Sequence, residues 1–304
     1  MSISGIFARI VAWIGATMIL MRRWGKETDP PAIGCSPMIP EAKAQGIPTL
    51  KMPTAKGWVG DHTPTAAPGL KVNAFARDLI HPRWIYILPN NDVLVAEALG
   101  LPWGKIKTPF DYAIFSTMKR AKAVGVSANR ITLFRDSDGD GVGEVQDTFL
   151  ENLYHPFGMT LLDGTFYVGN TDGIVAFPYS DGQTKITASG KQLVDFKPGG
   201  HWTRSLLASA DGTKIYAGVG SETNIAENGM EDEEGRAAIH ELDVKTGRSR
   251  IFASGLRNAV GMAWEPSSDT LWTVVNERDG LGDEVPPDYL TSVKDGGFYG
   301  WRFC

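Results

Sequence analysis

The segment GMTLLDGTFYVG at residues 158–169 decides the fold, because it combines two short apolar runs with a tight turn between them. The pair Asp163-Gly164 separates the runs, and such a pair between apolar and β-branched residues is a strong hairpin signal. The same arrangement recurs three more times, with first strands that begin at residues 84, 204 and 261. The sequence therefore predicts four copies of one β-hairpin.

The spacing of the hairpins indicates how they are arranged. A hairpin that returns at roughly 40–50 residues, with further strands between, is typical of a β-propeller. Each copy also ends in a short polar group, at Glu97, residues 170–172, residues 221–222 and residues 276–277. An antiparallel sandwich is the alternative, but it does not require the same hairpin four times. We expect an all-β fold of the propeller type.

The first interval between hairpins is the longest because residues 110–124 form an insertion. Their apolar stripe and basic face predict an amphipathic helix. Such a helix can pack on its own domain or rest on a membrane surface, and both arrangements remain open.

Composition excludes several classes of function. The chain of 304 residues carries a formal net charge of −5 and no basic block, whereas nucleic-acid binding needs a concentrated basic face. The two cysteines, Cys35 and Cys304, lie near opposite ends and imply no disulfide framework. The histidines show no zinc-binding spacing, and no nucleophile elbow, phosphate-binding loop or dinucleotide-binding fingerprint is present.

The N-terminal part differs from the rest of the chain. Residues 10–21 form an apolar run bounded by arginines, which has the length of a signal-peptide core. Extended back to residue 3, the run reaches the length of a short membrane anchor. We interpret residues 1–24 as a signal sequence or membrane anchor.

The remaining chain divides into a linker and a folded domain. Residues 25–68 are rich in proline and poor in periodic apolar positions, which predicts an extended linker. Residues 69–304 then form the propeller domain. We expect a periplasmic location, with attachment to the inner membrane through residues 3–21.

Residues 136–147 match a calcium-binding loop. Carboxylates stand at loop positions 1, 3, 5, 9 and 12, and a glycine occupies position 6, where the chain must turn sharply. The predicted ligands are Asp136, Asp138, Asp140, Glu144, Asp147 and the backbone carbonyl of Val142. The flanking runs are strand-like, so we expect a structural ion rather than a helix–loop–helix sensor. An Asp/Gly hairpin without an ion is the alternative.

Two further stretches carry candidate chemistry. Residues 255–264, GLRNAVGMAW, turn at a glycine and present Arg257 beside Asn258 before the next apolar run. A guanidinium next to an amide can bind carboxylates or carbonyls, although a turn with a surface arginine is the alternative. His201 immediately precedes the third hairpin, where an imidazole can serve as a base near neutral pH or simply cap the loop.

Taken together and in order, these stretches resemble the soluble glucose/sorbosone dehydrogenase family. The motifs are His-Trp-Thr-Arg at 201–204, Gly-Leu-Arg-Asn at 255–258, Asn-Glu-Arg-Asp at 276–279 and Gly-Gly-Phe-Tyr-Gly-Trp at 296–301. The similarity covers residues 69–301 and looks closest to the sorbosone dehydrogenase-like branch. Members of this family are six-bladed propellers that use pyrroloquinoline quinone (PQQ) with calcium.

The resemblance implies oxidation of a sugar or sugar aldehyde by hydride transfer to PQQ. It implies that His201 is the general base and that Arg257 and Asn258 grip the quinone, with Arg257 polarising the developing oxyanion. The turn Asp279-Gly280-Leu281 falls where backbone carbonyls hold the catalytic calcium, which acts as a Lewis acid. The electron acceptor is not implied.

The sequence also departs from the family pattern. The strand that supplies a base-orienting aspartate in glucose-oxidising members ends here in Ser221-Glu222, and Val260 stands where some relatives offer a polar cofactor contact. The chain stops at Cys304, soon after Trp301, where relatives continue, so we expect a six-bladed propeller that is incomplete at its C-terminus. A non-catalytic binding propeller and a calcium-dependent lactonase are the alternative functions.

Overall fold

The computed structural model describes residues 54–58, 60, 62–101, 108–281 and 286–303. The chain divides into a large unit, Thr54–Asn276 with Tyr289–Cys304, and a small unit to which Glu277–Asp288 belongs. The predicted leader and most of the linker lie outside the described residues, so the anchor at residues 3–21 and the periplasmic location stay predictions. Within the described part of the chain, no helix has the length and apolar character needed to cross a membrane.

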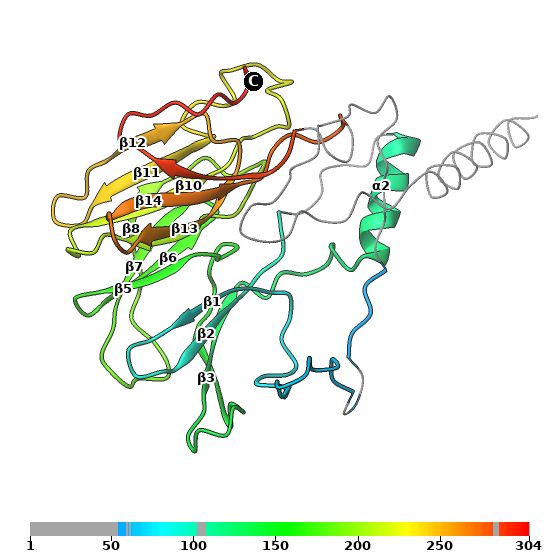
Figure 1. The fold of residues 1–304 in the computed structure, drawn as a ribbon, viewed down its shortest axis with the longest axis vertical. Coiled ribbons are helices and arrows are strands. Elements are labelled where there is room, and N and C mark those ends of the chain that lie inside the picture. Colours follow the sequence, from blue (N-terminus) through cyan, green and yellow to red (C-terminus); the bar gives the residue numbers. More distant parts are fainter. Residues whose placement is uncertain (1–53, 59, 61, 102–107, 282–285, 304) are drawn as a thin grey trace, which may run out of the picture. The chain divides into compact units, whose positions relative to one another are not determined.

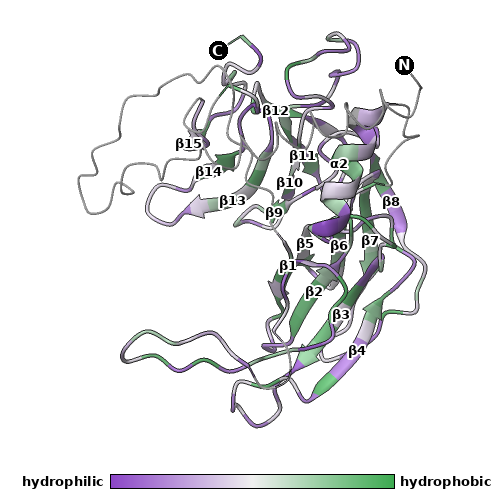
Figure 2. Ribbon diagram, turned by 90° about the vertical axis from the view of Figure 1, so that its right-hand side faces the viewer, coloured by the Kyte–Doolittle hydropathy of each residue, from purple (hydrophilic) through white to green (hydrophobic). Residues whose placement is uncertain are grey.

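The large unit contains four antiparallel sheets, whose strands are labelled in Figures 1 and 2. The first sheet consists of β1 (Pro82–Ile87), β2 (Val93–Glu97), β3 (Arg130–Arg135) and β4 (Val145–Leu150). The second consists of β5 (Met159–Leu162), β6 (Thr165–Asn170), β7 (Gly173–Pro178) and β8 (Lys191–Asp195). The third consists of β9 (Leu206–Ala208), β10 (Lys214–Val219), β11 (Ala238–Asp243) and β12 (Ser249–Ser254). The fourth consists of β13 (Ala259–Glu265), β14 (Thr270–Val275) and β15 (Tyr289–Val293).

The four predicted hairpins are confirmed, because each begins one of these sheets. Every sheet is a meander in chain order, which is the arrangement of a propeller blade. The six blades that the resemblance implies are not found: the described residues form four sheets. The predicted propeller type is therefore confirmed, whereas its six-bladed size is not.

Apolar side chains on both faces of internal strands such as β6 and β10 hold successive sheets together. Within β6, Phe166 and Val168 belong to a core cluster shared with the first sheet, whereas Tyr167 belongs to a cluster shared with the third. Likewise, in β10 Ile215 belongs to the core cluster shared with the second sheet, and Tyr216 belongs to the cluster shared with the fourth. Neighbouring residues of a strand point to opposite faces, so one strand serves two cores. Figure 2 shows the hydrophobic character of the central strands.

The predicted helix is confirmed as α2 (Pro109–Arg120), which begins with a capping box formed by Thr108 and Asp111. It ends four residues before the predicted boundary at residue 124. The backbone of Lys122 has a φ of 54°, a left-handed conformation that stops a helix.

The alternation of strand directions gives every sheet two distinct ends. One end, the hairpin end, carries the turns that join first to second and third to fourth strands, such as residues 88–92 and 136–144. The other, the crossover end, carries the loops between second and third strands and the connections from sheet to sheet. Hydrogen bonds between sheets join like ends: Ser221 N donates to Arg257 O at the crossover end (2.7 Å), and Trp264 Nε1 donates to Ala208 O at the hairpin end (2.7 Å).

The core between the first two sheets gives a test of this packing. Phe166 is fully buried and contacts Phe149 edge to face, with 5.2 Å between ring centroids. We expect Phe166→Ala to lower the free energy of unfolding by about 3–5 kcal/mol, because it leaves a cavity that rigid strands cannot close. Denaturant titration measures this change. Ile85→Ala, on a side chain that is 62% exposed, is the matched control and should change stability little; equal effects of both substitutions would contradict the assigned core.

Candidate functional site

The crossover end brings together the residues that the sequence singled out for chemistry. His201 lies on the connection between β8 and β9, and Arg257 and Asn258 lie on the connection between β12 and β13. Ser221 lies between them in space, because it follows β10 and its N–H bonds to Arg257 O. Residues far apart in the chain thus meet at one end of adjacent sheets.

Ser221 fixes the orientation of the His201 ring. Nδ1 of His201 lies 2.8 Å from the backbone oxygen of Ser221 and 3.1 Å from its Oγ, and the backbone N of His201 donates to the same carbonyl at 3.0 Å. The Ser221 hydroxyl donates its own hydrogen to Thr223 O at 2.6 Å, so Oγ can only accept from the ring. Both contacts require a hydrogen on Nδ1, which leaves the basic lone pair of the neutral ring on Nε2.

Gly220 explains how His201 and Asn258 approach each other. A Cβ atom at Gly220 would lie 2.4 Å from Asn258 Oδ1 and 2.6 Å from His201 Cβ, so any side chain here would displace both residues. The two side chains therefore flank the same bare backbone. Asn258 Oδ1 is buried and has no hydrogen-bond partner among the described residues. A buried polar atom without a partner is costly, so Asn258 Oδ1 is an acceptor that a water molecule or a ligand can satisfy.

Arg257 is buried, with 3% of its surface exposed, so the alternative of a surface arginine is wrong. Its Nε donates to Asn224 O at 3.1 Å, Nη2 to Asn224 Oδ1 at 2.9 Å and Nη1 to Asn276 O at 3.2 Å. The guanidinium thus joins the β10–β11 loop to the end of β14. It is also a fixed positive charge at the crossover end.

Two buried arginines that sequence reasoning missed hold the loop that carries His201. Arg204 is 0% exposed and donates from Nη1 to His201 O at 2.7 Å. Arg236 donates to Lys197 O and Gly199 O, both at 2.7 Å. Burial, together with the charge of Arg236, lowers the pKa of Arg204 to about 9, so this guanidinium is still charged at neutral pH. No local sequence signal distinguishes these arginines from exposed ones.

The two residues found in place of the orienting aspartate have separate tasks. Ser221 orients the base, whereas the carboxylate of Glu222 pairs with Arg236 at 3.0 Å. Glu233 in turn accepts hydrogen bonds from the backbone N of Glu222 at 2.7 Å and of Thr223 at 2.9 Å. These carboxylate and guanidinium contacts hold the loops that carry Ser221 and His201 together.

The other polar strand ends contribute differently. The carboxylate of Glu97 is fully buried and forms an ion pair with Arg130 at 2.7 Å, so its role is structural. Asp172, on the β6–β7 loop at the crossover end, has one buried carboxylate oxygen without a partner among the described residues. Burial raises the pKa of Asp172, and the neighbouring Asp195 adds to this effect.

A pocket of about 750 Å³ adjoins His201. The residues on either side of His201, Gly200 and Trp202, both line it. Its other walls come from β1, the segment after β2 and helix α2 with the residues that follow it, and include Arg83, Leu99, Phe115, Met118 and Lys119. The insertion therefore packs on the domain beside the candidate base, and this pocket has room for a sugar-sized ligand.

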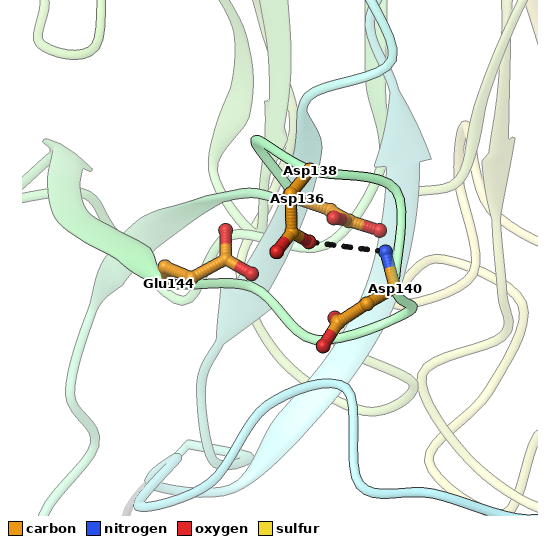
Figure 3. Close-up of side chains that lie close together, drawn as sticks. All are labelled: Asp136, Asp138, Asp140 and Glu144. Carbon is orange, nitrogen blue, oxygen red and sulfur yellow. Dashed lines mark hydrogen bonds between the residues drawn. The ribbon is translucent and has the colours of Figure 1, made fainter.

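The predicted calcium loop lies at the hairpin end, between β3 and β4, and is thus separate from His201. Four of its predicted ligands, Asp136, Asp138, Asp140 and Glu144, have carboxylate oxygens within 4.8 Å of one another (Figure 3). Backbone N–H groups shape the loop: Gly139 and Gly141 donate to Asp136, at 2.7 and 2.9 Å. Asp147 does not join this group, because it lies within β4 opposite Leu133. Val142 lies in the same loop, and its N–H donates to Asp140 at 2.8 Å.

The third predicted stretch, Asp279-Gly280-Leu281, belongs to the small unit. Gly280 has a φ of 94°, which confirms a turn at this position. Within this unit, the backbone N of Glu277 donates to Asp288 Oδ1 at 2.8 Å. The calcium-binding role of the turn stays a prediction.

Solved structures share this fold. The calcium structure of a Trichoderma reesei enzyme of carbohydrate-active family AA12 has a TM-score of 0.62 and 18% identity, covering 80% of this chain and 62% of its own. The holo form of the pyranose dehydrogenase PQQ domain from Coprinopsis cinerea has a TM-score of 0.60 and 17% identity, covering 78% of this chain and 58% of its own. The PQQ-bound aldose sugar dehydrogenase of Streptomyces coelicolor has a TM-score of 0.53 and 17% identity, covering 77% of this chain and 66% of its own. The chain thus spans less than two thirds of the length of each.

Sequence comparison gives the family. An uncharacterized protein of Borreliella burgdorferi is 25% identical over 161 residues, which are 49% of this chain and 41% of that protein. The family model described as TrAA12-like matches residues 120–287, which include His201, the Arg-Asn pair and the acidic loop. This match confirms, at the level of the family, the resemblance to quinoprotein sugar dehydrogenases. The chain belongs to the TrAA12-like family.

Proposed function

We propose that the protein is a PQQ-dependent oxidoreductase that oxidises a sugar or sugar aldehyde, with His201 as the general base. The observation that carries this proposal is the double anchorage of His201 Nδ1 on Ser221, which leaves the ring able to accept a proton at Nε2. A base for removing a hydroxyl proton needs this tautomer.

The neighbouring residues fit the cofactor. PQQ carries carboxylates, quinone carbonyls and one pyrrole N–H, so it needs both donors and an acceptor. Asn258 offers an amide whose buried oxygen has no partner among the described residues, and Arg257 supplies a fixed guanidinium at the crossover end. The cofactor supplies the two-electron acceptor when it is bound. His201 would take the hydroxyl proton, and Arg257 would stabilise developing negative charge on oxygen.

The alternatives differ in their support. A lactonase needs carboxylate and asparagine ligands that converge on a catalytic metal ion. Among the described residues, the one group of three or more His, Cys, Asp or Glu side chains placed to hold a metal is the loop at the hairpin end, away from His201. A binding propeller without catalysis does not need a histidine held in one tautomer. A measurement of sugar oxidation distinguishes such a protein from an enzyme.

The catalytic proposal is tested by loading the protein with PQQ and calcium and then adding sugar. We expect sugar-dependent bleaching of the bound quinone, slowed about 10²- to 10⁴-fold in His201→Ala because the proton acceptor is lost. The absorbance of the quinone measures both binding and reduction. His62→Ala, at an exposed histidine, is the matched control. Quinone binding without reduction by any aldose would instead favour a binding propeller.

The tautomer is tested without cofactor or substrate. ¹⁵N NMR of the histidine rings should show the neutral His201 ring protonated on Nδ1, because Ser221 O accepts from it at 2.8 Å. Ser221→Ala removes Oγ but keeps the backbone carbonyl. We therefore expect the same tautomer, with one fewer hydrogen-bond contact to fix the orientation of the His201 ring. A ring protonated on Nε2 in the unmodified protein would contradict the assignment.

We also propose that the loop at the hairpin end binds a structural calcium ion. Four carboxylates within 4.8 Å of one another repel each other, and a hard cation with oxygen ligands relieves this repulsion. The spacing of the acidic residues supports calcium over other ions. Because the loop closes the β3–β4 hairpin, the ion would stabilise the outer strands of the first sheet.

Calcium should raise the melting temperature of the protein, because an ion that binds the folded state stabilises it. We expect Asp140→Asn to weaken calcium binding by about 10-fold or more, as it removes one charged ligand. Asp147→Asn is the matched control, since Asp147 lies within β4. Isothermal titration of protein treated with chelator gives the calcium affinities of the two variants. A larger loss of affinity in Asp147→Asn than in Asp140→Asn would show that Asp147 is a ligand, as predicted from the sequence.

A further inference from the structure

The pocket beside His201 has an unbalanced charge. Two cationic side chains, Arg83 and Lys119, line it, and no Asp or Glu is among its described lining residues. Its other described walls are apolar, aromatic or glycine. A cationic pocket of this kind favours an anionic ligand.

Arg83 is held in a defined position. Its Nε donates to Ala98 O at 2.8 Å, and its guanidinium carbon lies over the Trp202 ring, 5.5 Å from the centroid. The terminal nitrogens of Arg83 make no hydrogen bond or ion pair with another described residue, and the side chain is exposed, so a ligand can reach them. A planar guanidinium fixed in this way recognises a carboxylate or phosphate through two parallel hydrogen bonds.

The same arrangement connects Arg83 to the candidate base. Trp202, on which Arg83 lies, follows His201 directly in the chain, and Gly200 on the other side of His201 also lines the pocket. A Cβ at Gly200 would come within 2.3 Å of the backbone of Glu222. The backbone at Gly200 is therefore packed too closely against Glu222 to accept a side chain. Arg83 of β1 is thus in contact with the β8–β9 connection, which carries His201.

We propose that this pocket binds the anionic group of an acidic aldose, so that Arg83 selects sugars carrying a carboxylate or phosphate at the end remote from the anomeric carbon. The proposal rests on the proposed oxidoreductase function for the identity of the ligand as a sugar. With the anionic group on Arg83, the sugar ring would extend toward the loop that carries His201. His201 would take the proton of the anomeric hydroxyl, bound PQQ would supply the acceptor for the hydride of the anomeric carbon, and the product would be a lactone.

The test is a binding measurement on the full chain without PQQ. D-Glucuronate, D-glucose 6-phosphate and D-glucose are titrated by calorimetry, with tryptophan fluorescence as a second readout. We expect at least one of the two anionic sugars to bind about 10-fold or more tighter than glucose, and we expect Arg83→Gln to abolish that preference. The carboxylate and phosphate arms show which anion the pocket takes. Arg120→Gln, on the same helix as Lys119 but outside the pocket, is the matched charge control.

Several outcomes would overturn the proposal. Equal affinities for charged and neutral sugars would do so, as would a preference that survives Arg83→Gln. If this substitution prevents folding, Arg83→Lys and the salt dependence of the preference in the unmodified protein decide the matter, because a preference that is insensitive to salt is not electrostatic. If Arg83→Gln weakens PQQ binding and leaves sugar discrimination intact, the pocket holds a cofactor carboxylate instead. Because sugar binding is measured without PQQ, the comparison of affinities remains valid even if the protein does not oxidise sugars.

Discussion

The packing of two-sided sheets is the constraint on which the rest of the structure depends. The internal strand β6 carries apolar residues on both faces, as Phe166 and Tyr167 show, so its sheet packs against a neighbouring sheet on each side. Burial on both faces fixes strand register, because a shift by one residue would exchange the two cores. It also aligns the sheets with like ends together, as the hydrogen bonds between them show.

This alignment places the candidate catalytic residues and the acidic loop at opposite ends of the sheets. Loops at the crossover end bring the base, the Arg-Asn pair and a cationic pocket together, whereas the acidic loop lies at the hairpin end. A cation bound by the acidic loop would therefore act on strand pairing, and the crossover end is where a small molecule would react. The β8–β9 and β10–β11 connections at the crossover end are long, and they carry His201, Ser221 and Glu222.

Long loops bring a difficulty, because their buried carbonyl groups need donors. The guanidinium groups of Arg204, Arg236 and Arg257 meet this need by donating to backbone oxygens of the loops. Each buried charge is stabilised by several hydrogen bonds, and Arg236 also by the carboxylate of Glu222. The result is a base held from both sides: by Ser221 at its ring and by Arg204 at its backbone.

The sequence by itself determined the features that depend on residues close together in the chain. The four hairpins, the capped helix, the acidic loop and the turn at Gly280 follow from turn residues and period, which act over a few positions. Only the tertiary structure decided that Ser221, 20 residues from His201, orients its ring, that Arg204 and Arg236 are buried, and that Asp147 is part of a strand and not of the acidic group. These outcomes depend on which loops the packed sheets bring to one end, and no local pattern of residues specifies that.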